Sequence, residues 1–369
     1  MHRIMPAVSW KTLCIGILAL AAAPWALADG GGSSVVNGAV PGAVNSATQG
    51  SYATRPEARA MIQELEKKGL NGDHVRALLA DAKRQDKILE AIARPAERTL
   101  DWAQYQKIFV QAGRVADGVD FAKTHLQVLK RAEAEYGVPA SVILAILGVE
   151  TRYGRHTGTY RALDALATLG FDYPPRGAFF RKQLAALFEL EQQAHIDAAT
   201  ITGSYAGALG YPQFIPTSYQ AYAVDFDGDG KIDLANSAAD AIGSVANYFH
   251  RHGWQPGLPI AARAQATGAA YQKLTAKGYQ PSFSLDEARK NGVVAVSCKN
   301  DRLTSEFCFD LPGDTLAAML DLNGAEGHEF WLVTNNFYVI TRYNHSDLYA
   351  MAVTQLSSHL ALAMQESTQ

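Results

Sequence analysis

The sequence predicts a mainly α-helical protein, α+β overall, with one small β-rich insert. Apolar residues recur at three- and four-residue steps through most of residues 55–261 and again after residue 346, as in amphipathic helices. Between about residues 262 and 330, β-branched and aromatic residues alternate between turn residues, which indicates strands. The 369 residues, 48% of them hydrophobic, are enough for about two or three domains with a sizeable core.

The first 28 residues have the pattern of a signal peptide. Basic residues precede an apolar run from Leu13 to Ala23, and the small residues Ala26 and Ala28 suit a cleavage site. We expect cleavage after Ala28, export and a soluble mature chain, because the run is short for a transmembrane helix and no later segment is long enough. An uncleaved anchor is the alternative.

Residues 29–54 are expected to form a flexible leader, because they are rich in Gly, Ser, Ala and Asn and poor in large apolar residues. Helical periodicity begins at Arg55 and predicts an N-terminal helical domain over residues 55–135. Its last helix is expected at about residues 119–136.

Two cysteines, Cys298 and Cys308, remain after the expected cleavage, and both lie in the predicted β-rich insert. In an oxidising compartment they would close a short loop as a disulfide. Two free thiols are the alternative.

The stretch from Val138 to Gly154 contains the candidate catalytic residue. An almost unbroken apolar run ends at Glu150, so we expect a buried helix over Ser141–Glu150 that stops near Gly154. An apolar wall and the negative end of the helix dipole would both raise the pKa of Glu150. A carboxyl that stays protonated near neutral pH can act as a general acid. A surface glutamate at the end of a core helix is the alternative.

Further helices are expected over residues 160–169, 179–194, 239–249 and 346–364. Between the second and third of them, residues 203–219 (GSYAGALGYPQFIPTSY) contain three glycines, two prolines and four aromatic residues. This composition excludes a regular helix throughout and predicts a constrained loop of the kind that lines a site.

Residues 225–233, DFDGDGKID, have the spacing of a calcium-binding loop: carboxylates at alternate positions and a glycine at the sixth. The twelfth position is Asn236 rather than the usual glutamate, so we expect a lengthened loop. The expected ligands are Asp225, Asp227, Asp229, the backbone carbonyl of Lys231 and Asp240. We expect one structural Ca²⁺ ion and no organic cofactor, since clustered carboxylates repel one another without a cation. A solvated acidic turn is the alternative.

Five motifs, taken together, resemble the membrane-bound lytic murein transglycosylase B family over most of residues 55–369. They are GVETRYG (148–154), GSYAGALGYPQFIPTSY, the DFDGDGKID loop, AIGSVANYFHRHGW (241–254) and NNFYVITRYNHS (335–346). The resemblance implies a lysozyme-like α-helical catalytic core over residues 136–261 and 330–369, with the small β-rich insert at 262–329. It also implies a periplasmic enzyme that cleaves the β-1,4 bond between N-acetylmuramic acid and N-acetylglucosamine in peptidoglycan and releases a 1,6-anhydromuramoyl end.

The resemblance also assigns site residues, with Glu150 as the single catalytic acid. The residues that match sugar-binding positions of the family are Ser204, Gln213, Tyr248, Tyr343, Asn344 and Tyr349, together with Tyr105 and Arg176 in less distinctive surroundings. Taken alone, each of these tyrosines is more often a packing residue than a ligand contact.

The residues near Glu150 offer no obvious second carboxylate, because Asp164 lies within an amphipathic helix and Asp172 beside a Pro-Pro turn. We therefore expect Glu150 to act as acid and then as base, with the C6 hydroxyl of the sugar as nucleophile. A muramidase that adds water and a non-catalytic peptidoglycan-binding protein are the alternatives. The net charge of -3 gives no sign of nucleic-acid binding; peptidoglycan strands and other cell-wall enzymes are the candidate partners.

Overall fold

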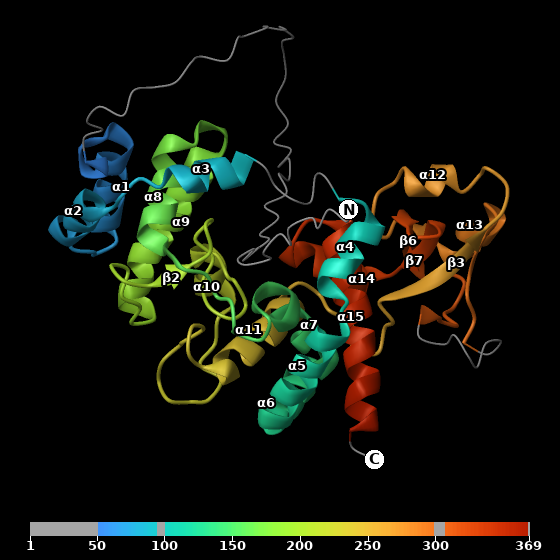
Figure 1. Ribbon diagram of the computed structural model, residues 1–369. Helices are drawn as coiled ribbons and strands as arrows, with labels where there is room; N and C mark the ends of the chain where they lie inside the picture. The colour runs from blue at the N-terminus through green and yellow to red at the C-terminus, as the bar shows by residue number, and fades with distance from the viewer. Residues whose placement is uncertain (1–50, 94–99, 299–306, 368–369) are drawn as a thin grey trace, which may run out of the picture.

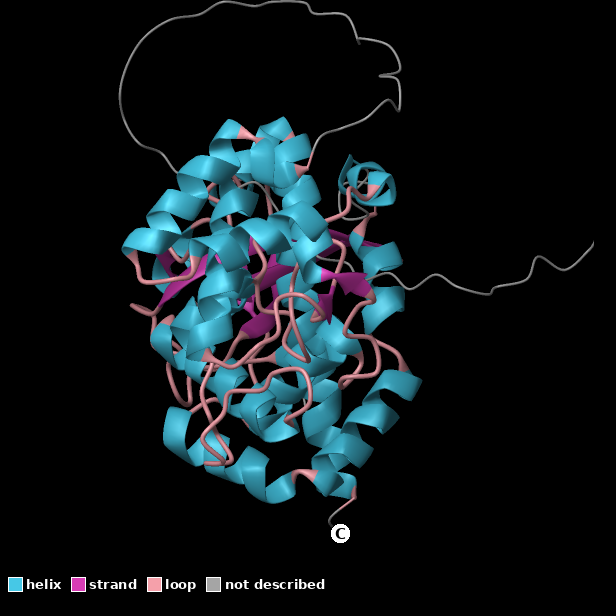
Figure 2. Ribbon diagram, turned by 90° about the vertical axis from the view of Figure 1, so that its left-hand side faces the viewer, coloured by secondary structure: helices cyan, strands magenta, loops and turns pink. Residues whose placement is uncertain are grey.

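The computed structural model describes residues 51–93, 100–298 and 307–367, which Figure 1 shows from the N-terminal helices to the C-terminal helix. The predicted signal peptide and most of the predicted leader lie outside the described residues. The described chain is mainly helical and contains a five-stranded sheet. This sheet and the first helices lie on opposite sides of the molecule in Figure 1, and helices and loops make up most of the face seen in Figure 2.

The first three helices pack against two later helices of the core. The five are α1 (Pro56–Lys67), α2 (Gly72–Asp81), α3 (Asp86–Ala93), α8 (Ala162–Asp172) and α9 (Gly177–Gln193). Helix α2 begins where it does because the Asn71 side chain accepts hydrogen bonds from the backbone N–H groups of Asp73 and His74. The N-terminal helices are thus joined to α8 and α9, which lie beyond the catalytic stretch in sequence.

The prediction of a flexible leader over residues 29–54 is wrong at its C-terminal end. Residues 51–54 contain a short 3₁₀ helix, η1 (Tyr52–Thr54), rather than flexible chain. Tyr52 is 4% exposed, its ring stacks on Phe171, and its hydroxyl donates a 2.7 Å hydrogen bond to Asp172. The Tyr52 ring fixes this segment on the end of α8. The average composition of the leader gave no sign of this, because it is dominated by small and polar residues.

The next three helices lie in another part of the molecule. They are α4 (Trp102–Phe109), α5 (Ala112–Thr124) and α6 (Leu126–Tyr136), which pack against α15 (Asp347–Glu366), α7 (Ala140–Thr151) and α11 (Ala238–Arg251). The range 55–135, expected as one N-terminal domain, is therefore divided between two sets of core helices (Figure 1). The helix expected at 119–136 is likewise two helices, α5 and α6.

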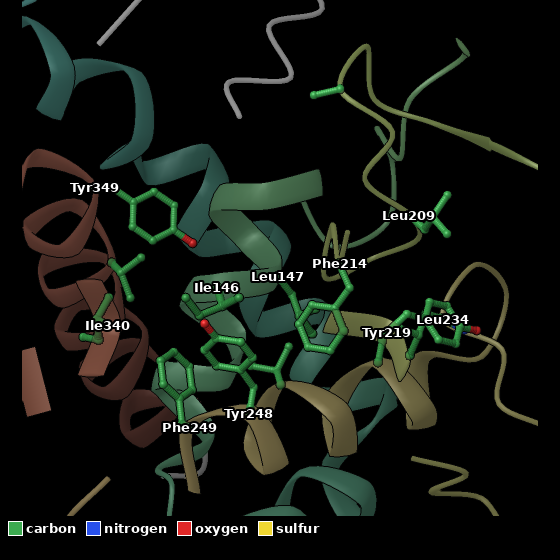
Figure 3. Close-up of a cluster of buried hydrophobic side chains, with 14 of the residues drawn as sticks. Ile146, Leu147, Leu209, Phe214, Tyr219, Leu234, Tyr248, Phe249, Ile340 and Tyr349 are labelled. Carbon is green, nitrogen blue, oxygen red and sulfur yellow. The ribbon is translucent and has the colours of Figure 1, made fainter. Parts of the chain in front are cut away.

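Helix α7 is the centre of the core. Every residue from Val142 to Gly148 is buried, so the helix is apolar on all sides rather than amphipathic. Figure 3 shows Ile146 and Leu147 with aromatic rings of the 203–219 loop, α11 and α15 around them. Burial of each such aliphatic side chain contributes about 1.5–3 kcal/mol. The position of Glu150, in the last turn of α7, is thus set by a buried apolar helix.

The β-rich insert is an antiparallel sheet with strand order β4-β6-β7-β3-β5. Its elements are β3 (Ala261–Ala266), α12 (Gln272–Thr275), β4 (Phe283–Ser284), α13 (Leu285–Lys290), β5 (Val293–Ala295), β6 (Leu316–Gly324) and β7 (Gly327–Val333). The sheet extends to Val333, beyond the expected boundary at 329. Residues 307–311, inside the range where strands were expected, are not strand, and Cys308 within them forms a disulfide with Cys298.

The remaining elements carry predicted site segments. They are β1 (Tyr160–Arg161), β2 (Thr202–Gly203), α10 (Pro216–Tyr222) and α14 (Asn335–Tyr343). Within the described residues, no single helix is both long and apolar enough to cross a membrane; one bent pair, α6 with α7, passes by length and composition alone.

Candidate active site

Glu150 lies half-buried in the last turn of α7 and accepts a 2.6 Å hydrogen bond from the Tyr349 hydroxyl. Tyr349 is on the first turn of α15, where Ser346 caps the helix by accepting a hydrogen bond from its backbone N–H. Burial, with the charge of Glu150 next in importance, raises the pKa of Tyr349 well above its ordinary value. The tyrosine therefore remains a hydrogen-bond donor at any working pH and orients the carboxyl group.

The chain after Glu150 has an unusual conformation. Arg152, Tyr153 and Gly154 have φ of 50°, 59° and 85°, so two residues other than glycine adopt the left-handed backbone conformation. Thr151 secures the turn, since its hydroxyl donates to the carbonyl of Tyr211 at 2.9 Å and accepts from the N–H of Gly154 at 3.0 Å. Such strain costs about 1–3 kcal/mol per residue and persists only where surrounding contacts fix it, typically at functional sites.

Ser204 begins a tight turn in the 203–219 loop and is 4% exposed. Its hydroxyl oxygen accepts hydrogen bonds from the N–H groups of Ala206 and Ala208, at 3.3 and 3.1 Å. Both contacts use the oxygen as acceptor, so the O–H group is the part of this side chain that can donate to a ligand.

Gln213 lies in the same loop with φ of 52°. Its side-chain NH₂ group donates to the carbonyls of Thr157 and Gly210, at 3.0 and 2.8 Å. Because both donor positions are used, the side-chain carbonyl oxygen is the part of Gln213 that can contact a ligand.

Tyr343 is the last residue of α14, and Asn344 caps that helix. The Tyr343 hydroxyl donates to the carbonyl of Pro212 at 2.5 Å, and burial, followed by the charge of Glu150, raises its pKa well above the ordinary value. Asn344 is 8% exposed, and its side-chain oxygen is buried without a hydrogen-bond partner among the described residues. An unpaired buried acceptor costs about 1–3 kcal/mol, which is typical of a group whose partner is a ligand.

Tyr248 and Tyr105 support the site from behind. The Tyr248 hydroxyl donates to the carbonyl of Arg342 at 2.6 Å, and its ring lies 4.8 Å from that of Tyr343. Tyr105 is fully buried, with its ring 4.9 Å from that of Phe109, and it is among the groups that raise the pKa of Tyr349. Both tyrosines thus pack against predicted contact residues, and Tyr105 exposes no surface to a sugar.

Arg176 lies in the 3₁₀ helix η3 (Pro174–Arg176), between α8 and α9. Its guanidinium group stacks on the ring of Phe179, 4.3 Å from the ring centre. Burial lowers its pKa below the ordinary value. The structure thus joins Tyr349 to Glu150 and Tyr343 to the carbonyl of Pro212, the residue before Gln213, whereas Arg176 contacts Phe179 of α9.

Asp164 and Asp172, the first two carboxylates after Glu150 in sequence, are both bound by arginines. Asp164 accepts from Arg161 at 2.6 Å, and Asp172 accepts from Arg55 at 2.7 Å. A groove of about 700 Å³ between α5 and the end of α15 contains none of the predicted site residues. Sequence reasoning missed Thr151 and Tyr211, although both lie inside motifs that it quoted; their contact across 60 residues has no sequence signal.

The acidic loop brings Asp225, Asp227 and Asp229 together, with carboxylate oxygens within 4.8 Å of one another. The two oxygens of Asp225 accept hydrogen bonds from the N–H groups of Gly228 and Gly230, at 2.7 and 2.9 Å. These glycines have φ of 80° and 87°, which allows the sharp turn. Three carboxylates with nearby backbone carbonyls are a set of hard oxygen donors that fits Ca²⁺.

Asp240, predicted as the last calcium ligand, is not part of that cluster. It is 1% exposed, and its two oxygens accept hydrogen bonds from the N–H groups of Phe226 and Asp233, at 2.7 and 2.8 Å. Burial raises its pKa above the ordinary value. In this structure Asp240 therefore joins the two ends of the acidic loop to α11, and its role as a ligand stays a prediction.

Comparison with known proteins places this geometry in a family. Residues 53–358 match the family model described as transglycosylase SLT domain. The chain is 38% identical over 326 residues to membrane-bound lytic murein transglycosylase B of Escherichia coli, covering 85% of each chain.

Solved structures are similar as well. Soluble lytic transglycosylase SltB1 from Pseudomonas aeruginosa matches with a TM-score of 0.77 and 44% identity, over 84% of this chain and 100% of that one. The Escherichia coli lytic transglycosylase Slt35 in complex with calcium matches with a TM-score of 0.74 and 37% identity, over 86% of this chain and 96% of that one. These neighbours have the lysozyme-like fold expected from the sequence.

Proposed function

The chain belongs to the transglycosylase SLT domain family, and we propose that Glu150 is its single catalytic group, acting as acid and then as base. The protein is a lytic transglycosylase of peptidoglycan, which cleaves the β-1,4 bond between N-acetylmuramic acid and N-acetylglucosamine and forms a 1,6-anhydromuramoyl product. One observation carries the assignment of the mechanism to Glu150. It is the carboxyl group held by Tyr349, while Asp164 and Asp172 are bound by arginines.

The first step is protonation of the leaving group. Glu150 gives its proton to the glycosidic oxygen as the bond from that oxygen to C1 of the muramoyl sugar breaks. The carboxylate of Glu150 then takes the proton of the C6 hydroxyl while the C6 oxygen forms the new bond to C1. Glu150 ends the cycle protonated, as it began, and no water is consumed. Ring closure within one sugar has a high effective concentration, so a second protein carboxylate is unnecessary.

Neutral groups of the site bind and orient the sugar. The Ser204 hydroxyl can donate, while the unpaired oxygen of Asn344 can accept. Together they complement an N-acetyl group, which offers one acceptor and one donor. The Tyr343 ring, at the end of α14, adds an apolar face, and the side-chain oxygen of Gln213, in the 203–219 loop, adds a second acceptor. The proposed sugar contacts therefore bring no further charge beside Glu150.

Mass spectrometry of peptidoglycan digested with the purified protein tests this mechanism. We expect muropeptides that end in 1,6-anhydromuramic acid, which are lighter by one water than hydrolysed products. A digest that contains only hydrolysed ends would show a muramidase, and an undigested glycan would show a binding protein.

We also propose one structural Ca²⁺ ion in the acidic loop, held by Asp225, Asp227, Asp229 and the carbonyl of Lys231, with Asp240 as a further candidate ligand. The related Slt35 has been solved in complex with calcium, and the three carboxylates here form a compact oxygen cluster. Bound calcium would neutralise that cluster and fix the connection between α10 and α11. Helix α11 carries Tyr248, which packs behind Tyr343.

Chelation tests the calcium site. An ion at about 100 times its dissociation constant stabilises a fold by about 2.7 kcal/mol, so its removal should lower Tm by several degrees. The Asp227→Asn variant should show a lower Tm and a smaller response to chelator. An identical melting curve with and without chelator, in protein shown by metal analysis to start loaded, would contradict the proposal.

Finally, we propose that the chain is exported to the periplasm and cleaved near Ala28, where its substrate lies. The Escherichia coli relative is named as membrane-bound, whereas the motif before Ala28 here is that of a cleaved signal peptide. Mass measurement of the N-terminus of protein purified from its native host tests this. A chain that begins at residue 1 in the membrane fraction would contradict cleavage.

A further inference from the structure

A short antiparallel ladder supports the two predicted sugar-binding residues of the 203–219 loop. Strand β1 pairs with β2, whose last residue directly precedes Ser204. Two further bridges continue the ladder from Gly203 to Leu209 and from Leu209 to Phe214, the residue after Gln213. The position of β1 is therefore transmitted through backbone hydrogen bonds to Ser204 and Gln213.

The segment that leads into β1 also contacts these residues directly. The carbonyl of Thr157 accepts a 3.0 Å hydrogen bond from the side chain of Gln213. A Cβ atom at Gly158 would lie 2.1 Å from the carbonyl oxygen of Gly203, so the two backbones are in close contact. Residues 157–161 therefore form one wall of the loop, and whatever holds their end determines where the wall lies.

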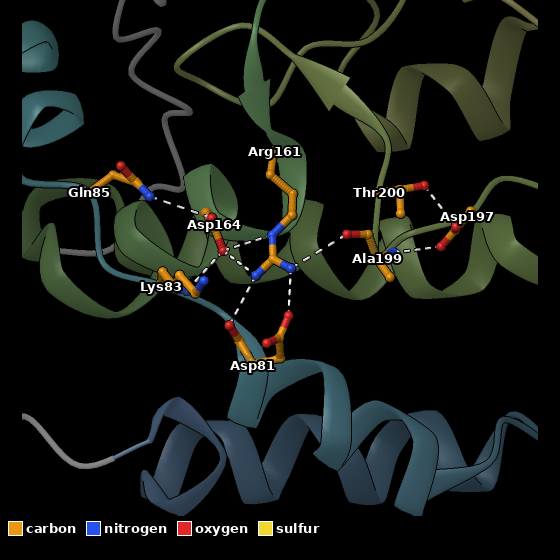
Figure 4. A network of polar contacts seen from close by, with 8 residues as sticks. All are labelled: Asp81, Lys83, Gln85, Arg161, Asp164, Asp197, Ala199 and Thr200. Atoms are coloured by element: carbon orange, nitrogen blue, oxygen red, sulfur yellow. Dashed lines mark hydrogen bonds and ion pairs between the residues drawn. The ribbon is translucent and has the colours of Figure 1, made fainter.

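Arg161, in β1, is that fixed end (Figure 4). Its guanidinium group donates to a carboxylate oxygen of Asp164 from two nitrogens, at 3.0 and 2.6 Å. It also donates to the carboxylate of Asp81 at 2.5 Å, to the backbone carbonyl of Asp81 at 3.0 Å and to the carbonyl of Ala199 at 3.5 Å. These contacts use all five N–H donors of the arginine fork, an arrangement that a lysine cannot reproduce.

The partners of Arg161 belong to rigid elements outside the sugar site. Asp81 is the last residue of α2, and Asp164 lies in the first turn of α8 with its side chain 9% exposed. Asp164 also accepts hydrogen bonds from the backbone N–H of Lys83 and the side chain of Gln85. One buried carboxylate thus joins the connection between α2 and α3, helix α8 and the strand that leads to Ser204.

We propose that Arg161 is a positioning residue for the lytic transglycosylase reaction, which holds the ladder carrying Ser204 and Gln213 against α2 and α8. This role rests on the proposed function of those two residues. It gives the N-terminal helices, which carry none of the proposed sugar-binding residues, a part in shaping the site. Arg161 itself touches no substrate and acts through the backbone of β1 and β2.

A matched pair of arginines separates positioning from general stability. Arg161 and Arg55 have side chains that are 23% and 24% exposed, and each joins the N-terminal region to an aspartate of α8. Arg55 pairs with Asp172 and donates to the carbonyl of Phe171, at the end of α8 opposite Asp164. Arg161→Lys and Arg55→Lys should therefore lower Tm by similar amounts, but only Arg161→Lys should move the ladder.

The experiment measures kcat and KM for total cleavage of glycan strands, together with Tm, in both variants and in each combined with Ser204→Ala. We expect Arg161→Lys to lower kcat/KM about tenfold, since small misplacements of site groups have effects of this size or larger. Arg55→Lys should stay within about twofold of wild type. The Arg161→Lys effect should largely disappear in the Ser204→Ala background, because coupled residues do not act additively.

Three outcomes would overturn the proposal: unchanged kcat/KM in Arg161→Lys, an equal loss in both arginine variants, or full additivity with Ser204→Ala. If Arg161→Lys does not fold, Asp81→Asn is the second variant, since it removes one partner and leaves the buried Asp164 contact. It should then lower kcat/KM by a smaller factor than tenfold, and a wild-type value would count against the proposal. Total cleavage is scored, so hydrolytic products would refute the proposed function and leave this comparison valid.

Discussion

The Glu150 site and the acidic loop are built in opposite ways. Glu150 receives its hydrogen bond from Tyr349, 199 residues further along the chain. In the acidic loop, Asp225, Asp227 and Asp229 lie within five residues and accept hydrogen bonds from N–H groups of the same loop. The first site exists because the core helices pack correctly, whereas local backbone geometry creates most of the second.

This difference determines whether a substitution at each site should affect stability or catalysis. A change in the acidic loop should affect a connection between two helices and thereby stability, with little effect on the reacting groups. A change around Glu150 should affect the reaction strongly even where stability stays the same. Variants of the two sites can therefore test whether catalysis depends on the long-range contacts and stability on the local ones.

Replacement of Glu150 by glutamine should have the largest effect. The amide cannot exchange a proton, and general acid–base groups contribute about 10²–10⁴-fold, so we expect kcat to fall by about a thousandfold or more. Tm and affinity for glycan fragments should stay near wild type because the side chain is isosteric. Anhydromuramoyl release is measured by mass spectrometry. Glu64→Gln, an exposed position in an ion pair with Lys67, is the control. Substantial cleavage by Glu150→Gln would show that another residue is the acid.

Replacement of Tyr349 by phenylalanine removes only the hydroxyl group that donates to Glu150. We expect kcat to fall about 10- to 100-fold, because the carboxyl group loses the contact that orients it. Stability should fall by about 1–2 kcal/mol, since the buried ring remains. Steady-state kinetics and urea unfolding measure both effects. Tyr271→Phe, in the insert, is the control, and equal activity in the two variants would mean that Tyr349 only packs.

The same division explains which features the sequence could predict. The helix around Glu150 was expected over Ser141–Glu150 and lies over Ala140–Thr151, and its almost unbroken apolar run is buried on all sides. The acidic loop was predicted from spacing alone, and the structure brings three of its carboxylates together. Both features depend on neighbouring residues, which are what a sequence displays directly.

Features that depend on distant contacts were not predictable in the same way. Tyr105 was expected at the sugar and is fully buried behind Tyr349, since no local pattern distinguishes a packing tyrosine from a contact. Arg161 and Asp164 are three residues apart, but the contact of Arg161 with Asp81, 80 residues away, has no sequence signal. By contrast, the β6–β7 hairpin depends on neighbouring residues, because Gly324 pairs with Gly327 across the two-residue turn Ala325-Glu326.

Glycine substitutions provide a narrower comparison of the two regions. Gly158 has φ of 99°, and a Cβ atom there would lie 2.1 Å from the carbonyl oxygen of Gly203 and 2.6 Å from the N of Ser204. Backbone atoms cannot move aside cheaply, so Gly158→Ala should cost about 3 kcal/mol through overpacking and backbone strain. It should also lower kcat/KM by displacing Ser204. Chemical unfolding and kinetics measure both; wild-type kinetics in folded protein would show that the Ser204 turn tolerates movement.

Gly230 in the acidic loop isolates the local effect and should give the smallest change. Its φ is 87°, close to that of Gly158, but a Cβ atom there would meet no atom within 4 Å. Gly230→Ala should therefore cost only the strain of a left-handed alanine, about 1 kcal/mol, and leave kcat at its wild-type value. If this variant lost as much activity as Gly158→Ala, the acidic loop would be coupled to the reacting groups. The division between a local stabilising site and a long-range catalytic site would then be wrong.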